Sequence, residues 1–175
     1  ADDKILAISS SGYYELLSYD LSTHFPEDMV IIEKYLDKKP ITAIYFHGDK
    51  KQFYIKRFIP EFKTKKIYFI DRTKHSYLEL VFSGNQFNLE LQFIKPRNKS
   101  SRPNAIINPE KFISIKGVTV LGNQLSRYSI KSISITEKQK IKENTVPSDD
   151  LKDNGKKAIV HDEKDQDSSQ IKMNF

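Results

Sequence analysis

The sequence predicts an all-β protein built from repeated hairpin units, and three observations support this class. The chain has 175 residues, among them 11 Phe and 9 Tyr, and aromatic residues favour strands. Short apolar runs end at glycines that recur along the chain, with prolines between the runs. Helical periodicity is weak over the first 136 residues. A propeller-like array of about three to four hairpin blades, closed or partly open, fits this pattern best.

Four glycines mark the predicted turns. Gly12, Gly48, Gly84 and Gly122 lie 36, 36 and 38 residues apart, and each separates two apolar runs. The last three are followed by Asp or Asn, and Gly with Asn or Asp is a hairpin signal because these residues tolerate positive φ. The sequence therefore predicts a strand, a turn and a second strand at each of the four positions.

Further strands are predicted between these turns, at residues 29–32, 67–70, 112–115 and 130–135. Residues 87–93 alternate apolar and polar side chains, which predicts one buried and one solvated face. The best candidate for a helix is residues 28–36, where it competes with a predicted strand.

The last part of the chain differs in composition from the rest. Residues 137–175 carry 8 Lys and 9 Asp or Glu, and Phe175 is their one aromatic residue. Such a segment buries too little apolar area to offset the entropy lost on ordering. The sequence predicts a β domain over residues 1–137 and a polar, mostly disordered tail over residues 138–175, with Ile159 and Val160 as the point where the tail could dock.

Several classes of protein are disfavoured by what the sequence lacks. The chain has no Cys, which rules out disulfides, Cys-based zinc sites and a thiol nucleophile. No apolar run approaches the roughly 18 residues that span a bilayer, and no signal-peptide pattern opens the chain. We expect a soluble, cytoplasmic protein. The chain starts with Ala1 rather than Met, and we expect it to be part of a longer protein.

No catalytic or cofactor-binding motif is found. The sequence has no phosphate-binding loop, dinucleotide fingerprint, paired-His metal helix or serine elbow. Its four histidines are scattered, and His47 is expected to be a surface residue beside the turn at Gly48. Neighbouring carboxylates such as Asp2 and Asp3 point to opposite faces of a strand. We expect no catalytic residue, no metal and no cofactor in this chain.

Positive charge is concentrated in the middle of the chain. The formal net charge is +6; residues 1–49 carry 4 Lys or Arg against 9 Asp or Glu, whereas residues 50–116 carry 15 against 5. Cations on loops and strand edges at repeated intervals suit a phosphate backbone, because each contact releases condensed counterions. Contacts with a nucleic-acid phosphate backbone are predicted at Lys50, Lys51, Lys56, Arg57, Lys63, Lys65, Lys66, Arg72, Lys95, Arg97, Lys99, Arg102, Lys111, Lys116, Arg127 and Lys131.

Two other features bear on this prediction. Lys56 and Arg57 follow an alternating strand, and both are expected to reach outward past the rim of a sheet. Aromatic residues at 45, 46, 53 and 54 could stack on bases, although in such strands aromatic side chains more often form the core. The alternative role for the cations is solubility and protection of strand edges.

The order of several blocks resembles a known family. Residues 42–50 (TAIYFHGDK) and 53–58 (FYIKRF) resemble the blade motif YNxIYxDGK…YxKRF. This motif occurs in the C-terminal domain of the A subunit of bacterial type IIA topoisomerases, in the gyrase and topoisomerase IV form of Bacteroidetes-like bacteria. Residues 3–12, 112–125 and 128–131 are similar to neighbouring blocks of that domain in order and spacing, so the resemblance covers about residues 2–136.

This resemblance implies a fold and a function. The family fold is a β-pinwheel, in which neighbouring blades exchange strands and a basic rim binds and bends duplex DNA and presents the transported segment. The cleaving tyrosine, the Mg²⁺ carboxylates and the ATPase of the family lie in other domains or in the B subunit. The implied partners are double-stranded DNA, the rest of the A subunit and the ATPase B subunit. The glutamine-arginine-glycine box of gyrases is not seen, so the resemblance is nearer to topoisomerase IV.

Two other functions compete with this one on the residues alone. A β-repeat scaffold for protein interactions would direct its basic face toward an acidic protein or membrane surface. A propeller-type glycoside hydrolase would need convergent carboxylates, and none can be placed from the sequence.

Overall fold

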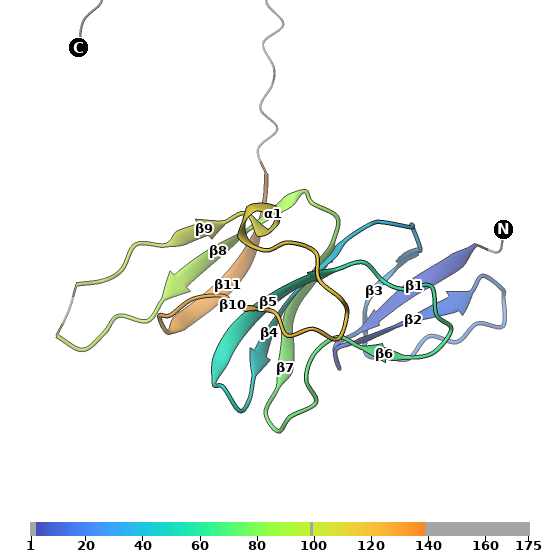
Figure 1. Ribbon diagram of the computed structural model, residues 1–175, viewed down its shortest axis with the longest axis horizontal. Coiled ribbons are helices and arrows are strands. Elements are labelled where there is room, and N and C mark those ends of the chain that lie inside the picture. Colours follow the sequence, from blue (N-terminus) through green and yellow to red (C-terminus); the bar gives the residue numbers. More distant parts are fainter. Residues whose placement is uncertain (1–2, 99, 139–175) are drawn as a thin grey trace, which may run out of the picture. The chain divides into compact units, whose positions relative to one another are not determined.

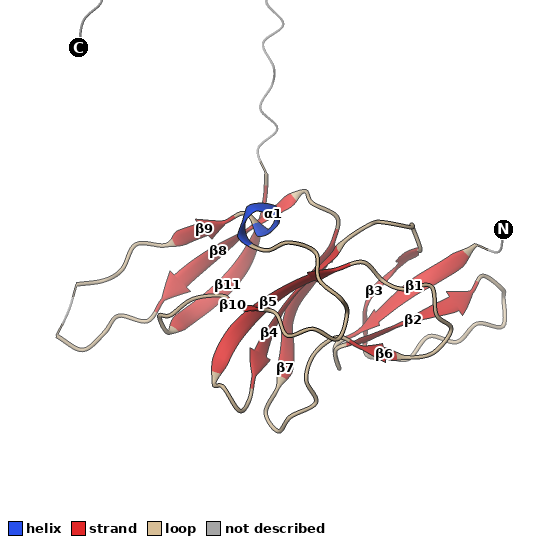
Figure 2. Cartoon of the chain, viewed as in Figure 1, coloured by secondary structure: helices blue, strands red, loops and turns tan. Residues whose placement is uncertain are grey.

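The computed structural model describes residues 3–98 and 100–138 of the chain. Within these ranges the regular secondary structure is almost entirely β, as Figures 1 and 2 show. The strands are β1 (Lys4–Ser9), β2 (Tyr13–Ser18), β3 (Met29–Lys34), β4 (Ile41–His47), β5 (Gln52–Phe58), β6 (Ile67–Tyr68), β7 (Tyr77–Ser83), β8 (Phe87–Phe93), β9 (Ala105–Ile107), β10 (Asn123–Gln124) and β11 (Ile130–Glu137). A single helical turn, α1 (Pro109–Phe112), follows β9. The predicted all-β class is confirmed.

The strands form three antiparallel sheets that do not close into a barrel. Sheet 1 has the order β3-β1-β2-β6, sheet 2 the order β10-β5-β4-β7, and sheet 3 the order β11-β8-β9. In each sheet one central strand pairs with the strand that follows it and with a later strand: β1 with β2 and β3, β4 with β5 and β7, β8 with β9 and β11. The sheets are therefore three copies of one layout, compatible with a pinwheel-like array.

Short strands link neighbouring copies. β6 follows β5 of sheet 2 in the chain but pairs with β2 of sheet 1. β10 follows β9 of sheet 3 but pairs with β5 of sheet 2. Each of these two sheets is thus completed by a strand from the next copy, which ties the three sheets into one unit.

Two of the four predicted hairpins are confirmed. β1 and β2 pair across the turn at Gly12, and β4 and β5 pair across the turn at Gly48. The hairpin predicted at Gly84 is wrong, because β7 pairs with β4 and the chain then crosses into sheet 3. The hairpin at Gly122 is also wrong, because β10 pairs with β5. An apolar run shows that a segment is extended, but it does not say which distant strand becomes its partner.

Two other local predictions are decided by the structure. A strand was predicted at residues 112–115, but residues 109–112 form α1 instead. Asn108 caps this turn by accepting a hydrogen bond from the Glu110 N–H, and Pro109 occupies the first helical turn. At residues 29–34 the strand is confirmed, because β3 pairs with β1 and places Ile31 opposite Ile8. The competing helix is wrong. The predicted tail lies outside the described residues, apart from Lys138.

Two apolar cores lie on opposite faces of sheet 2. The first joins Leu6, Ile8, Tyr14 and Leu16 of sheet 1 to Ile41, Ala43, Tyr45, Tyr54 and Phe58 of sheet 2. The second joins Ile44, Ile55 and Phe82 of sheet 2 to Leu89 and Leu91 of sheet 3, with Ile113 and Leu125 from the segments before and after β10. Sheet 2 is therefore buried on both faces.

Candidate nucleic-acid interface

The structure divides the sixteen predicted cations by exposure. Lys99 lies outside the described residues. Lys56 and Arg57 are buried, and Lys116 is half-buried with its Nζ donating to Asn123 Oδ1 at 2.7 Å. The others are exposed, at Lys50, Lys51, Lys63, Lys65, Lys66, Arg72, Lys95, Arg97, Arg102, Lys111, Arg127 and Lys131.

Lys56 and Arg57 do not reach outward past a rim, so that expectation is wrong. Their exposed fractions are 3% and 5%. The Lys56 Nζ donates to the backbone carbonyls of Phe69 at 2.5 Å and Val118 at 3.0 Å. The Arg57 guanidinium donates to the carbonyl of Ile113 at 3.2 Å and to the side chain of Asn85 at 2.7 Å. Both cations therefore hold segments of the fold together, and we exclude them from the interface.

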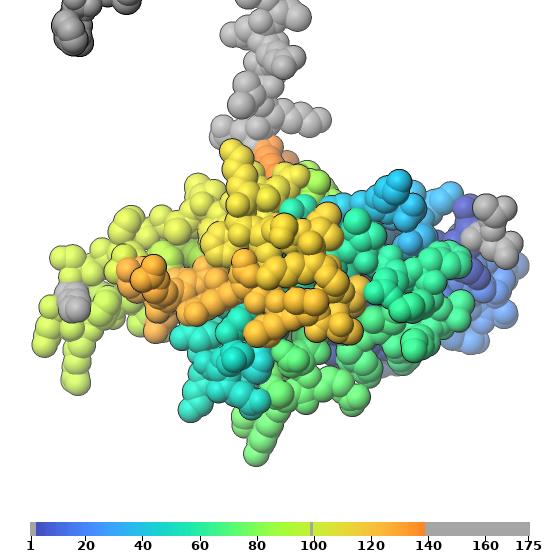
Figure 3. Space-filling view, viewed as in Figure 1, coloured from blue at the N-terminus to red at the C-terminus, as the bar shows by residue number. Residues whose placement is uncertain are grey.

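The physical reason is that another part of the chain covers β5. The Lys116 N–H donates to the Arg57 carbonyl at 2.8 Å. At Gly122 an added Cβ would lie 2.2 Å from the Ile55 carbonyl oxygen, so only glycine lets the chain pass this close. Figure 3 shows the segment between β9 and β10, in yellow, lying across the middle of this face. The sequence around Lys56 does not predict that residues about sixty positions away will cover it.

Burial changes the acid-base properties of both residues. Desolvation lowers the pKa of the Lys56 ammonium to about 8, although the charge of Asp71 acts in the opposite direction. Desolvation also lowers the pKa of Arg57, and Glu110 opposes that shift. These shifts reflect a structural position, because the hydrogen bonds of both side chains are directed into the protein.

The first group of exposed cations surrounds β6. We call Lys63, Lys65, Lys66 and Arg72 the β6 cluster. The Lys66 Nζ lies 4.6 Å from the centre of the Tyr13 ring, and the Arg72 guanidinium lies 4.6 Å from the centre of the Tyr68 ring. The two rings contact each other, with their centres 5.4 Å apart. A cation on a ring face is held in place while its other N–H groups stay available to an anion.

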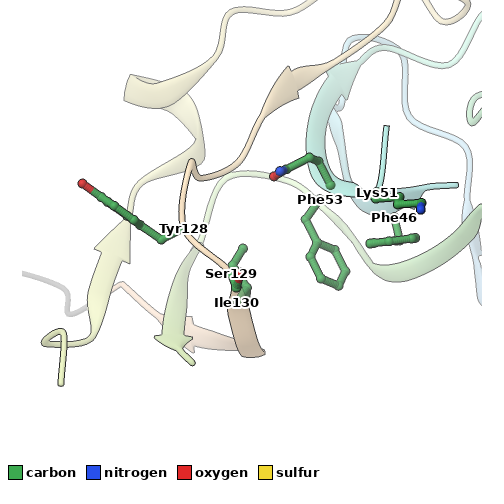
Figure 4. A pocket seen from close by; sticks show the side chains of 7 residues that line it. Phe46, Lys51, Phe53, Tyr128, Ser129 and Ile130 are labelled. Atoms are coloured by element: carbon green, nitrogen blue, oxygen red, sulfur yellow. The ribbon is translucent and has the colours of Figure 1, made fainter. Parts of the chain in front are cut away.

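A second group of exposed cations, Lys50, Lys51, Arg102 and Arg127, lies near a groove between sheets 2 and 3. Figure 4 shows this groove. The groove has a volume of about 140 Å³ and is lined by Phe46, Lys51, Gln52, Phe53, Tyr128, Ser129 and Ile130. The Phe53 ring projects into the space between the β4–β5 turn and Ser129, whereas the Tyr128 ring points away from the groove. The Arg102 guanidinium lies 3.5 Å from the centre of that Tyr128 ring.

Local backbone geometry places the cations of this groove. Lys51 has a φ of 52° and its N–H donates to the His47 carbonyl at 2.8 Å, which closes the tight turn that carries Lys50 and Lys51. Arg102, from the β8–β9 loop, lies on the Tyr128 ring, and the exposed Arg127 precedes Tyr128 in the chain. Lys51 lines the groove itself. Lys111 and Lys131 lie on other elements, α1 and β11.

The aromatic residues near the groove fall into two classes. Tyr45 and Tyr54 are core residues. Phe46 and Phe53 are half-buried at the surface, where the Phe46 ring stacks on that of Tyr77 with centres 5.4 Å apart. No local pattern predicts Tyr77 at this place, because the contact depends on the pairing of β4 with β7.

His47 is not a surface turn residue as expected. Its exposed fraction is 6%, and its Nε2 lies 3.3 Å from Asp71 Oδ2. The cause is again a distant segment, since the Gly48 N–H donates to Ser76 Oγ at 2.9 Å and an added Cβ at Gly48 would meet the Lys74 carbonyl oxygen at 1.9 Å. Residues that follow β6 thus cover the turn.

Other kinds of site are not found in the part of the chain that the structure describes. It shows no group of three or more His, Asp or Glu side chains that could hold a metal ion. Among the same residues no helix is long and apolar enough to cross a membrane.

Comparison with known proteins gives one match. A family model described as the topoisomerase C-terminal domain of Bacteroidota matches residues 1–138. No curated protein and no solved structure matches the chain.

Proposed function

Because the chain belongs to the topoisomerase C-terminal domain family of Bacteroidota, we propose that it is a non-catalytic module that binds and bends duplex DNA. In this proposal it is part of the A subunit of a type IIA enzyme, nearer to topoisomerase IV than to gyrase. It presents the transported DNA segment to the rest of the A subunit and to the ATPase B subunit. The proposed location is the cytoplasm, at the nucleoid, and the module itself uses no cofactor.

The observation that supports DNA binding most is that few of the exposed cations, among the described residues, form ion pairs. Among the described residues, Lys63 is the one exposed member of the predicted set that forms an ion pair, with Glu61. By contrast, two of the four cations of residues 3–49 are paired, Lys34 with Asp3 at 3.0 Å and Lys39 with Glu33 at 2.9 Å. Unpaired cations attract phosphates without first losing a protein partner.

The placement of these cations favours one region of the surface. Lys51 lines the groove between sheets 2 and 3 and Lys50 precedes it in the same turn, while Arg102 lies on the ring of Tyr128, a groove residue that follows Arg127. Strands β1, β2 and β3 of sheet 1 lie in the acidic residues 1–49. We infer that the duplex lies across the sheet 2–sheet 3 groove, with the β6 cluster as a second contact.

Duplex binding that depends steeply on salt tests this function. We expect four to six phosphate contacts, each adding a slope near −0.9 to log K against log salt, so that affinity falls roughly 10²- to 10³-fold between 50 and 200 mM salt. Fluorescence anisotropy with labelled duplexes of unrelated sequence measures both the slope and the lack of sequence preference. Binding that ignores salt, or no duplex binding at all, would leave the protein-interaction scaffold as the better reading.

Charge reversal locates the interface. The variant Lys50→Glu, Lys51→Glu, Arg102→Glu, Arg127→Glu should weaken duplex binding at least about tenfold more than a control that reverses Lys4, Lys34, Lys38 and Lys39. Both variants change the formal charge equally, so a difference must come from position. Circular dichroism checks that both stay folded. Equal losses would mean that net charge alone drives binding.

A further inference from the structure

Three aromatic side chains form a cluster on the face of sheet 2 that packs against sheet 3. Phe46 of β4 lies opposite Phe53 of β5 and Tyr77 of β7 in the strand register. The centre of the Phe46 ring lies 5.2 Å from that of Phe53 and 5.4 Å from that of Tyr77. Phe53 packs against the core between sheets 2 and 3, so the cluster continues this core to the surface. We call Phe46, Phe53 and Tyr77 the aromatic cluster.

The aromatic cluster is less covered than the neighbouring aromatic pair of sheet 2. Tyr45 and Tyr54, one residue away on the same two strands, have exposed fractions of 0% and 9%. Phe46 and Phe53 are half-buried, and Tyr77 is 46% exposed. A contiguous exposed apolar patch, unlike a single exposed residue, is typical of an interaction site. The cluster is therefore a candidate for contact with a ligand.

One ring of the cluster enters the groove between sheets 2 and 3. Figure 4 shows the Phe53 ring projecting into this space, between the β4–β5 turn and Ser129. Lys51 is the one charged side chain among the seven residues that line the groove, and Gln52 and Ser129 add polar groups. An aromatic ring, a positive charge and hydrogen-bonding groups thus meet in one recess.

We propose that this groove binds an unpaired base of single-stranded DNA. An aromatic ring beside cations is the combination that suits a single strand, because every base has a π-face and every nucleotide has a phosphate. In this arrangement the base stacks on the Phe53 ring, its edge meets Gln52 and Ser129, and its phosphate lies at Lys51.

The recess distinguishes this site from a duplex contact. The bases of a duplex are paired and stacked on one another, so a base enters a recess only after it has left the stack. A side chain that kinks a duplex must instead project as a wedge between base steps, whereas Phe53 is half-buried and lines the groove. Duplex phosphates can lie across the same cations without any base entering. The inference therefore goes beyond duplex binding and does not depend on it.

A second stacking surface lies beside the groove. Tyr128 lines the groove, and the Arg102 guanidinium lies 3.5 Å from the centre of its ring. The guanidinium is planar, so a base can stack on it while its N–H groups contact a phosphate. Phe53 and Arg102 thus serve successive bases of one strand. Because stacking accepts any base, we expect little preference for sequence.

A fluorescent reporter tests the stacking, because the chain has no Trp. In the variant Phe53→Trp, a mixed-sequence single-stranded DNA oligonucleotide should quench the indole fluorescence when a base stacks on the ring. Phe87→Trp is the matched control, since Phe87 is half-buried against the same core and does not line the groove. The oligonucleotide should leave its fluorescence unaltered, and a duplex of the same sequence should quench Phe53→Trp far less. No quenching by the single strand, or equal quenching by the duplex, would overturn the proposal.

Affinity measurements test it without a new ring. Phe53→Leu removes the aromatic face but keeps an apolar side chain. It should weaken binding of the single strand about tenfold, and at least about threefold more than binding of the duplex. Phe87→Leu makes the same change away from the groove and should alter neither affinity. Circular dichroism checks that both variants stay folded.

The outcomes separate this inference from the proposed function. Equal losses of single-strand and duplex affinity in Phe53→Leu would overturn the inference, as would tighter binding of the matched RNA strand than of the DNA strand. If the wild type binds the single strand but no duplex, the proposed function fails and this inference stands.

Discussion

Sheets 2 and 3 share one strand layout but have different surroundings. Sheet 2 packs on both faces: Ile41, Ala43 and Tyr45 of β4 contribute to the core shared with sheet 1, and Ile44 to the core shared with sheet 3. Sheet 3 packs on one face, through Leu89 and Leu91. On its other face Glu90 accepts a hydrogen bond from the exposed side chain of Asn104 at 2.8 Å, and Gln92 is exposed.

The difference shows how a repeated unit is adapted to its place in a stack. A strand buried on both faces needs apolar side chains at nearly every position, whereas a strand at the end of the stack needs them at every second position. β4 has the sequence ITAIYFH and β8 the sequence FNLELQF. The pattern of a strand therefore reports its position in the stack as well as its conformation.

The largest expected effect is the loss of a side chain from the middle sheet. Ile55 of β5 has an exposed fraction of 0% and belongs to the core between sheets 2 and 3, whereas Ile135 of β11 is 36% exposed. Ile55→Ala should lower the free energy of unfolding by about 2–5 kcal/mol, and Ile135→Ala by less than about 1 kcal/mol. Urea unfolding of both variants measures this. Similar losses would show that the outer part of sheet 3 is covered in solution.

A smaller effect is expected where the chain passes over β5. An added Cβ at Gly122 would lie 2.2 Å from the Ile55 carbonyl oxygen, whereas at Gly117 the nearest atom, on Val120, would be 3.4 Å away. Gly122→Ala should therefore cost about 1–3 kcal/mol through the shift it forces on the covering segment. Gly117→Ala is the matched control, with an expected change under about 1 kcal/mol. If both variants unfold alike, the cover on sheet 2 is looser than the contact at Gly122 implies.

The sequence was a good guide to strands and a poor guide to their partners. Alternation at residues 87–93 and the runs beside Gly12 and Gly48 predicted β8 and two hairpins. Nothing local to Gly84 or Gly122 indicated that the strands beside them pair elsewhere, because β7 pairs with β4 and β10 pairs with β5, both far back in the chain. A strand that pairs with a strand of another unit leaves no periodic pattern in the sequence that would show it.

The same limit applied to the candidate interface. Lys50 and Lys51 were predicted at a turn and lie there exposed, because turn residues are set by local sequence. Lys56 and Arg57 were placed on the rim and are buried, because the carbonyls of Val118 and Ile113 that receive their hydrogen bonds are 62 and 56 positions away. The stacking of Arg102 on Tyr128 also depends on a distant contact. Charge and alternation locate cations along the chain, but only the fold decides which of them meet solvent.

The smallest expected effect concerns the buried ammonium of the middle sheet. Lys56 is enclosed by sheet 2 and the segments that cover it, whereas Lys131 of β11 in sheet 3 is exposed. Asp71 favours the charged form of Lys56 and Lys116 opposes it, and the Tyr45 ring lies 5.9 Å from the ammonium. Lys56→Met should change how stability depends on pH, and Lys131→Met is the control that removes a cation from an exposed site.

The sign of the effect follows from the two pKa values of Lys56, about 8 in the folded protein and 10.5 as its ordinary value. Between these values the unfolded chain binds a proton that the folded chain does not, so unfolding takes up a proton and becomes less favourable as pH rises. The stability contributed by this linkage is present above the unfolded pKa and is lost as pH falls through about 8.

Wild type should gain up to about 1 kcal/mol per pH unit relative to Lys56→Met above pH 8. Urea unfolding between pH 7 and 9.5 avoids the opposite contribution of Tyr14 and Tyr45, whose pKa values burial raises to about 12. Parallel pH profiles for wild type and Lys56→Met would mean that water reaches the ammonium and that the middle sheet is less enclosed than its two cores indicate.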